Sequence, residues 1–198
     1  MDPNAVINRI VRLAKLDTTV FDEVKDDAAE LIPALVVAAV SALLAGLGAF
    51  LYIQVNYSGK PDSLFVNTAI LGTLFLIAMY AVWVLVVYVM LAQIFKVSAD
   101  LQSLFRTMGY AAIPLAASIL MFIPVIYPVF AVVPIALLFV MSIYAVQSVT
   151  NAESNQVVIA NIAGFALMVL VLGLVATSVD FAKAPMGAGL FSWIPKIP

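Results

Sequence analysis

Four long apolar blocks constrain this chain more than any other feature. They cover residues 31–52, 68–95, 110–146 and 157–179. About 20 residues at 1.5 Å each cross the roughly 30 Å hydrocarbon core of a bilayer. The third block would make one helix of about 55 Å, which is too long for a single crossing. It is therefore predicted to fold back, so that the chain has five spans.

Prolines predict where the third block folds back. Pro124 and Pro128 lie close together, and each removes a backbone donor and clashes with the preceding helical turn. Pro114 is predicted to kink the third span, and Asp100 to cap its start. The predicted spans are 31–52, 68–95, 101–123, 129–147 and 157–179, which form a transmembrane domain at 31–179, followed by a Gly/Pro-rich interfacial tail at 180–198. A re-entrant hairpin that does not reach the far side is an alternative for spans three and four.

Composition agrees with this fold class, an all-α polytopic membrane protein. Apolar residues make up 65% of the chain and charged residues 10%, against roughly 45–50% and 25% in soluble domains. The chain has no cysteine and no histidine, which excludes disulfides, zinc fingers and catalysis by either residue. No acidic residue lies deep in a span, which argues against a proton-coupled carrier or an intramembrane aspartyl protease. We expect no enzyme activity, no cofactor, no metal and, with a net charge of -2, no nucleic-acid partner.

The distribution of basic residues predicts the orientation. With the N-terminus inside, one group falls on the cytoplasmic side and a smaller group outside. The inner group is Arg9, Arg12, Lys15, Lys25, Lys96 and Arg106, and the outer group is Lys60, Lys183 and Lys196. We expect a cytoplasmic N-terminus and an external C-terminus, in a prokaryotic cell membrane.

Residues 1–30 are predicted to form an amphipathic cytoplasmic helical hairpin. In its first helix Val6, Ile7, Ile10, Val11, Leu13 and Ala14 fill one arc, and Asn8, Arg9, Arg12 and Lys15 fill the other. We expect this helix to lie on the cytoplasmic leaflet, with its basic side chains near anionic lipid.

The second helix is predicted to run from Thr18 or Thr19 towards Pro33. One of its faces is acidic, with Asp22, Glu23, Asp26, Asp27 and Glu30. The simplest interpretation is a solvated face, partly neutralised by Arg9, Arg12 and Lys15. A docking surface for a basic partner is the second interpretation, and a cation site is the third.

Small residues predict close helix packing within the bilayer. Ala38, Ala42 and Gly46 recur at four-residue spacing in span one, and this register lets helix backbones approach. Intramolecular packing is the first explanation and self-association the second. Intramembrane polar side chains are few, and Trp83 is expected to be buried.

The stretch from Val97 to Pro114, VSADLQSLFRTMGYAAIP, resembles the signature of the Yip family of Ypt/Rab-interacting membrane proteins, in its prokaryotic branch. The matching elements fall on Arg106, Gly109, Tyr110, Ala111 and Pro114, followed by the turn at Pro124–Pro128. The resemblance extends over about residues 15–178. It implies five spans with a cytoplasmic N-terminus.

The resemblance also implies a class of partners. Eukaryotic relatives bind prenylated Rab-type GTPases, associate with each other and help to shape or sort vesicle membranes, and no enzymatic activity is established for the family. Their long N-terminal domain and its Asp-Leu-Tyr-Gly-Pro-Leu motif are missing here. We therefore expect no Rab-type GTPase partner for a prokaryotic chain.

The same motif has a physical interpretation of its own. Gly109 lets its helix approach a neighbour, and Pro114 frees a carbonyl one turn back, near Tyr110. Arg106 is expected to snorkel towards a phosphate headgroup, or to meet one of the carboxylates between Asp22 and Glu30. A kink and an anchor with no binding role are the alternative.

Together these features favour a non-enzymatic membrane scaffold that organises membrane or protein partners. Its expected partners are membrane lipids and other membrane proteins or further copies of itself. A transporter or channel subunit, with spans three and four lining the path, is the first alternative. An accessory subunit of a larger energy-transducing membrane complex is the second.

Overall fold

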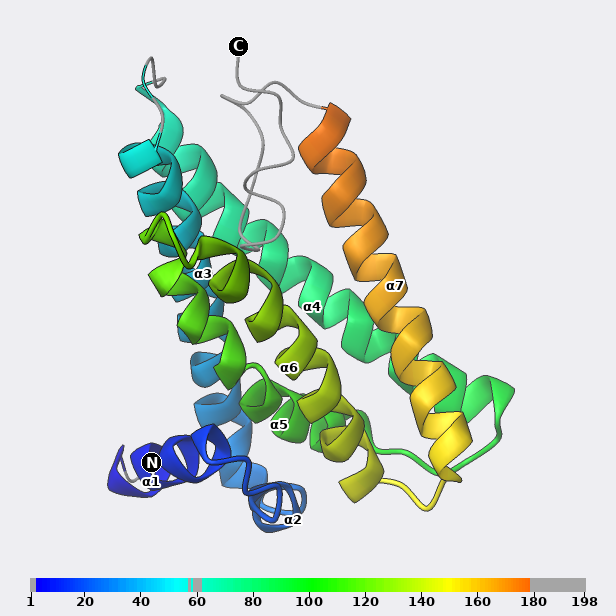
Figure 1. Cartoon of the computed structure of the whole chain (residues 1–198). Coiled ribbons are helices and arrows are strands. Elements are labelled where there is room, and N and C mark those ends of the chain that lie inside the picture. The colour runs from blue at the N-terminus through cyan, green and yellow to red at the C-terminus, as the bar shows by residue number, and fades with distance from the viewer. Residues whose placement is uncertain (1–2, 57, 59–61, 179–198) are drawn as a thin grey trace. The chain divides into compact units, whose positions relative to one another are not determined.

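The computed structural model describes residues 3–56, 58 and 62–178, with the side chains of 176–178 left out, so the predicted tail at 180–198 lies outside the described residues. Within these ranges the regular structure is entirely helical (Figure 1). In chain order the elements are α1 (Pro3–Ala14), α2 (Val20–Val24), η1 (Ala28–Glu30), α3 (Leu31–Asn56), η2 (Val66–Leu71), α4 (Gly72–Val89), η3 (Met90–Ile94), α5 (Leu101–Ala111), η4 (Ile113–Phe122), α6 (Tyr127–Ser148) and α7 (Ser154–Ser178).

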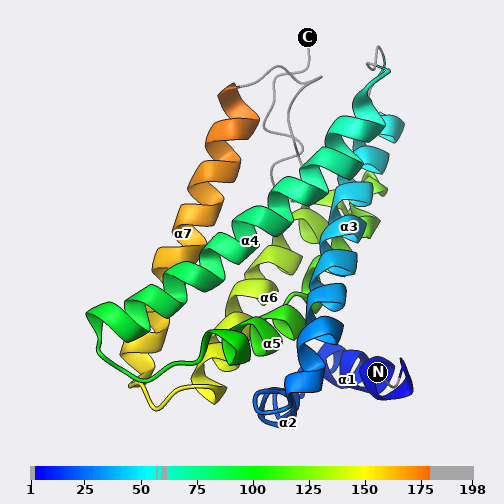
Figure 2. The same cartoon turned by 180° about the vertical axis from the view of Figure 1, so that it is seen from behind.

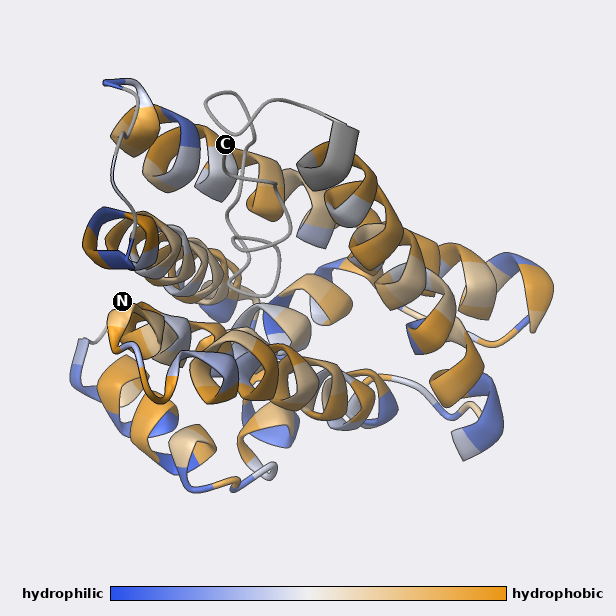
Figure 3. Ribbon diagram, turned by 45° about the horizontal axis from the view of Figure 1, so that its top comes forward, coloured by the Kyte–Doolittle hydropathy of each residue, from blue (hydrophilic) through white to orange (hydrophobic). Residues whose placement is uncertain are grey.

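Five helical segments are long and apolar enough to cross a membrane, which confirms the predicted fold class. They are Ala28–Asn56, Val66–Ile94, Leu101–Phe122, Tyr127–Ser148 and Ser154–Val175. Figure 3 shows hydrophobic residues along the long helices and hydrophilic ones mainly at helix ends and connections. The protein is therefore an integral membrane protein, because a bilayer is the only solvent that suits so much exposed apolar surface.

The chain forms two compact units. Of the described residues, the first unit contains 3–38, 81–113 and 138–167, and the second contains those within 39–80, 114–137 and 168–178. In the first unit Phe21, Leu104, Met108 and Trp83 are fully buried. Figures 1 and 2 both show α1 lying across the first turns of α3 in this unit, rather than along them.

The second unit has its own core of aromatic and aliphatic side chains. Tyr52, Ile53, Leu64 and Met121 are buried together, and the ring of Tyr127 packs on Tyr52 with 4.9 Å between centroids. Close backbone approach is needed here as well. A β-carbon at Gly48 would collide with the backbone carbonyl of Ser118, so α3 and η4 can pack this tightly only with a glycine at that position.

Small residues pack helices of the same chain together, as the first explanation predicted. A β-carbon at Gly46 would collide with Thr73 and lie 3.2 Å from the carbonyl oxygen of Ala69. At Gly109 it would lie 2.8 Å from the carbonyl oxygen of Ala34. Ala42 is buried and Ala38 is half-buried. Self-association stays a prediction.

Span three changes helix type at the predicted proline. The α-helix α5 ends at Ala111, and the chain continues as the 3₁₀-helix η4, which contains Pro114. The proline ring cannot follow α-helical turns without clashing with an earlier carbonyl. The chain turns back at Pro124–Ile126, as expected, and Pro128 falls in the first turn of α6, where a missing N–H costs little.

The predicted second N-terminal helix is wrong in its extent. It was expected to continue towards Pro33, but α2 ends at Val24. Asp27 is extended, and its side chain accepts a hydrogen bond from the Ala29 N–H at 2.9 Å, which starts η1 as a separate turn. Pro33 lies instead in the first turn of α3.

Candidate functional site

Helix α1, α2 and η1 form a layer of short helices at the start of the chain, here called the N-terminal layer (residues 3–30). Val6 and Leu13 of α1 are buried against the protein. Leu16 adopts a left-handed conformation with φ 62°, and the Asp17 N–H returns to the Arg12 carbonyl at 3.0 Å. This closure ends α1 and turns the chain back towards α2.

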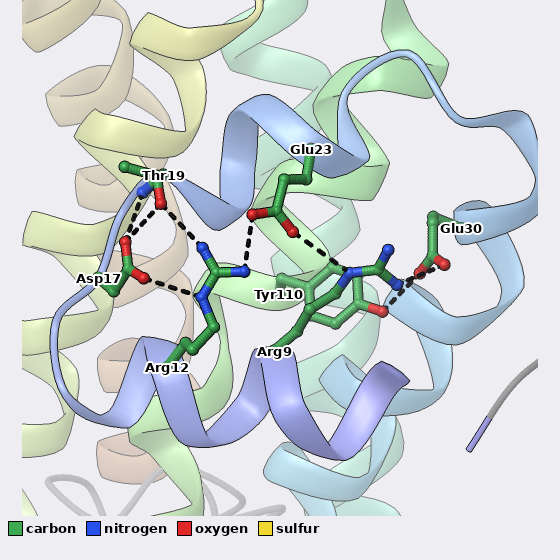
Figure 4. A network of polar contacts seen from close by, with 7 residues as sticks. All are labelled: Arg9, Arg12, Asp17, Thr19, Glu23, Glu30 and Tyr110. Carbon is green, nitrogen blue, oxygen red and sulfur yellow. Dashed lines mark hydrogen bonds and ion pairs between the residues drawn. The ribbon is translucent and has the colours of Figure 1, made fainter. Parts of the chain in front are cut away.

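Arg12 joins the two helices of the layer through three partners (Figure 4). Its guanidinium lies 2.8 Å from Asp17, 2.6 Å from Glu23 and 2.9 Å from the Thr19 hydroxyl. The Thr19 hydroxyl and N–H both donate to Asp17, at 2.6 and 3.1 Å. These hydrogen bonds, led by that of the Thr19 hydroxyl and followed by that of Arg12, lower the pKa of Asp17 to about 2.

Arg9 connects α1 to the entry of span one (Figure 4). Its guanidinium donates to Glu30 at 2.5 Å and lies 4.0 Å from Glu23. The side chains of Arg9 and Glu30 are only 16% and 12% exposed, so this pair is largely desolvated. Burial alone would lower the pKa of Arg9, but the hydrogen bond and charge of Glu30 outweigh burial and raise it.

Glu30 also binds the predicted motif of span three. The Tyr110 hydroxyl of α5 donates to the second carboxylate oxygen of Glu30 at 2.6 Å (Figure 4). Both oxygens of one carboxylate are thus used, one by α1 and the other by α5. Tyr110 is fully buried, and the sequence did not identify Glu30 as the partner of its hydroxyl.

Arg106 points inward, which corrects the prediction that it snorkels to lipid headgroups. It is 5% exposed, and its Nε and Nη2 atoms both donate to the backbone carbonyl of Lys25. The Ser103 hydroxyl donates to the same carbonyl at 2.8 Å. Arg106 therefore closes the end of α2, because a helix terminus leaves carbonyls that need donors.

The start of α5 is capped as predicted. The Asp100 side chain accepts from the Ser103 N–H at 2.7 Å. This backbone hydrogen bond, ahead of the charge of Arg106, lowers the pKa of Asp100. Asp100 lies 3.8 Å from Arg106, so the cap also neutralises part of the buried cation.

The predicted acidic face divides into two groups. Glu23 and Glu30 turn towards Arg9 and Arg12, which confirms the predicted pairing for those two arginines. Asp22, Asp26 and Asp27 are exposed and form what is here called the acidic surface. Asp22 pairs with Lys25 at 2.9 Å and so raises the pKa of that lysine. Lys15, the third basic residue expected to neutralise the acidic face, is exposed.

A polar pocket of about 260 Å³ opens beside the acidic surface, and sequence reasoning did not find it. It is lined by Lys25, Asp26, Ser98, Ser103, Ser148, Val149, Thr150 and Asn151. These residues come from three segments that are distant in sequence: the end of α2, the start of α5 with the connection before it, and the end of α6 with the connection after it. No pattern in the sequence predicts that these three segments come together.

The role of Asp17 and Thr19 was also not predicted. Their hydrogen bonds form a turn ahead of a helix, and an Asp followed two residues later by a Thr is a recognisable signal for such a turn.

A second polar network lies among the spans of the same unit. The Trp83 indole N–H donates to Asn161 at 2.9 Å, and the Asn161 amide donates to Ser142 at 2.9 Å. The Ser142 hydroxyl donates to the Phe139 carbonyl at 2.6 Å. A β-carbon at Gly164 would collide with the Trp83 ring, so this glycine makes room for the indole. The burial expected for Trp83 is confirmed.

The fold and this site define a class: a polytopic helical membrane protein whose N-terminal layer is fastened to its third span. The model of the Yip1 domain family matches residues 18–177. The chain belongs to the Yip1 domain family, as its resemblance predicted, and the match includes α2, η1 and the Arg106–Pro114 motif. No curated protein and no solved structure matches the chain. The prokaryotic branch stays a prediction.

Proposed function

We propose that this protein is a non-enzymatic membrane scaffold, and that its acidic surface docks a partner of basic chemistry. The observation that carries the proposal is the division of the carboxylates. Glu23 and Glu30 hold the layer together, whereas Asp22, Asp26 and Asp27 remain exposed. Exposed carboxylates on a fixed support favour encounter with a cationic surface.

The support beneath the acidic surface is well fixed. Arg106 and Ser103 hold the Lys25 carbonyl, which lies between Asp22 and Asp26 in sequence. Arg9 and Tyr110 hold Glu30 a few residues later. Because the acidic segment is fastened on both sides, a partner that binds it would lose little affinity to ordering.

The polar groups of the spans support a structural rather than a chemical role. Thr68 and Thr73 donate to carbonyls one turn back in their own helix, and Trp83, Asn161 and Ser142 pair with each other. Among the described residues, no three acidic, histidine or cysteine side chains are grouped to hold a metal ion. These arrangements favour packing over catalysis or transport.

The test is recovery of partners from membranes of the native host in mild detergent. Asp22→Asn, Asp26→Asn and Asp27→Asn combined should reduce recovery severalfold and leave insertion unchanged. Asparagine keeps an acceptor at position 27, so the cap of η1 survives. The matched control is Asp62→Asn with Glu153→Gln, which neutralises two exposed carboxylates outside the layer. Equal recovery with the triple variant and with wild type would refute the proposal.

A further inference from the structure

Helix α1 carries apolar side chains that the protein does not cover. Ile7 and Val11, one turn apart, are 58% and 45% exposed, and Leu16 just beyond the helix is 59% exposed. Val6 and Leu13 of the same helix are buried. The apolar arc of α1 is therefore wider than its contact with the protein, and one side of the arc remains uncovered.

The position of α1 shows which apolar phase lies nearest. Its Arg9 is paired with Glu30, and Leu31 directly after Glu30 begins α3. Figures 1 and 2 show α1 lying across the first turns of α3. A helix that lies across a span at its entry is parallel to the bilayer plane, at the depth of the lipid headgroups.

Exposed apolar residues continue from α1 onto span one. Ile32 in the first turn of α3 is 68% exposed, and Leu35 and Val36 in the next turn are 45% and 46% exposed. In a membrane span such residues face lipid, because lipid tails are the solvent there. The uncovered side of α1 thus adjoins a surface whose neighbour is already the bilayer.

The basic residues of α1 exclude a mainly electrostatic attachment. Arg9 and Arg12, which were predicted to meet anionic lipid, are occupied by Glu23, Glu30 and Asp17. Lys15 remains exposed at the border of the apolar side. One lysine contributes far less attraction to an anionic leaflet than the basic cluster typical of charge-driven binding.

We infer that α1 is an interfacial anchor, which embeds Ile7, Val11 and Leu16 between the headgroups and acyl chains of the leaflet around span one. The ligand is the apolar boundary of the bilayer itself, so binding does not depend on headgroup charge. This inference concerns the lipid side of the layer and stands apart from the proposed docking of a partner on the acidic surface.

The absence of cysteine from the chain makes the test specific. Ile7→Cys, Val11→Cys and the control Asn8→Cys, at an exposed polar position of the same helix, are each labelled with an environment-sensitive NBD dye. The full chain is reconstituted in vesicles of phosphatidylcholine, with and without phosphatidylserine. Labels at positions 7 and 11 should emit at shorter wavelength, and nitroxide-bearing lipids should quench them severalfold more than the label at position 8, in both lipid mixtures.

Three outcomes would overturn the inference. If the labels at positions 7 and 11 emit at the same wavelength as the label at position 8, the uncovered apolar side of α1 lies in water. Quenching that requires phosphatidylserine would make the attachment electrostatic. Labels shielded from both water and lipid quencher would mean that a second copy of the chain covers the uncovered apolar side of α1. The purified chain suffices for this test, so its result does not depend on any partner.

Discussion

The two polar networks of the first unit both join helices, but the first uses charged side chains and the second uses neutral ones. The N-terminal layer uses charged pairs, and the side chains of Arg12, Asp17 and Glu23 remain 29%, 36% and 44% exposed. Trp83, Asn161 and Ser142 are fully buried, and the network that they form contains no charge. Charged side chains are tolerated at the ends of the spans because water still solvates them there. Among the spans a charge would be costly, so neutral hydrogen-bonding groups are favoured.

The contacts of the N-terminal layer differ in what they contribute: some add stability and others mainly fix its position. Exposed ion pairs contribute little to stability, so most contacts in the layer serve to position it. The exception is the Arg9–Glu30 pair, whose two side chains are both largely buried. Among the ion pairs of the layer, this one should therefore contribute most to stability, in addition to the hydrogen bonds from Arg106 and Ser103 to the Lys25 carbonyl. The span network should lose stability at whichever of its residues is removed.

The largest effect is expected for Glu30→Ala. It leaves the Arg9 guanidinium and the Tyr110 hydroxyl without their acceptor, and loss of one partner of a buried pair costs about 3 kcal/mol. Unfolding in mixed detergent should show this loss, and protease should cleave more readily between α1 and α3. Glu153→Ala, at an exposed carboxylate, is the matched control. If the two variants unfold alike, Glu30 does not hold the layer.

Asn161→Leu should have the next largest effect, about 1–2 kcal/mol, because it removes the acceptor of the Trp83 N–H in an apolar environment. The same unfolding assay measures the loss, and the N-terminal layer should keep its protease resistance. Ile162→Leu, at the exposed neighbouring position, serves as the control. A stability equal to wild type would mean that the network is not needed for packing.

Tyr110→Phe should cost about 0.5–1.5 kcal/mol, the value of a single hydrogen bond. Glu30 keeps Arg9 as a partner in this variant, so the layer should loosen without detaching. Combining Tyr110→Phe with Glu30→Ala should add little to the loss from Glu30→Ala alone, because both changes remove the same contact. Fully additive losses would show that Tyr110 acts through another neighbour.

The smallest effect is expected from acidification. Asp17 has a pKa of about 2 in the folded protein, below the ordinary 3.8. A carboxyl with a lowered pKa stabilises the fold above its ordinary pKa and loses that contribution as pH falls through the folded value. A spin label at Lys15→Cys should gain mobility between about pH 4 and pH 2, and Asp17→Asn should remove that part of the curve. A label at Ile162→Cys should not respond, since the span network has no group that titrates there.

Much of the fold could be predicted because its causes are local. Apolar length gave five spans, Asp100 capped α5, and Pro114 ended its α-helical geometry. The spans, the cap and the helix end each depend on residues that are close together in the chain, so the sequence carries the signal. Gly109 could be expected to allow a close approach because it is small, but the sequence did not identify Ala34 as its neighbour.

The site was only partly predictable because its decisive acceptor is a backbone carbonyl. Arg106 turns inward because the end of α2 supplies the Lys25 carbonyl. Every residue has a backbone carbonyl, so the residue type at position 25 does not predict this contact. The same bond supplies a donor to a carbonyl that is left open where α2 ends. Nothing in the sequence explains the π-helical turns η2 and η3 at the two ends of α4.

The bond between Arg106 and Lys25 also sets an order of events during synthesis. The two residues are 81 positions apart, and at roughly 5–20 residues per second about 4 s or more separate their addition to the chain. Over that time two spans have been made while the end of α2 still lacks its donors. The amphipathic N-terminus is then open to the insertion machinery and to chaperones, and it can settle only after span three has emerged.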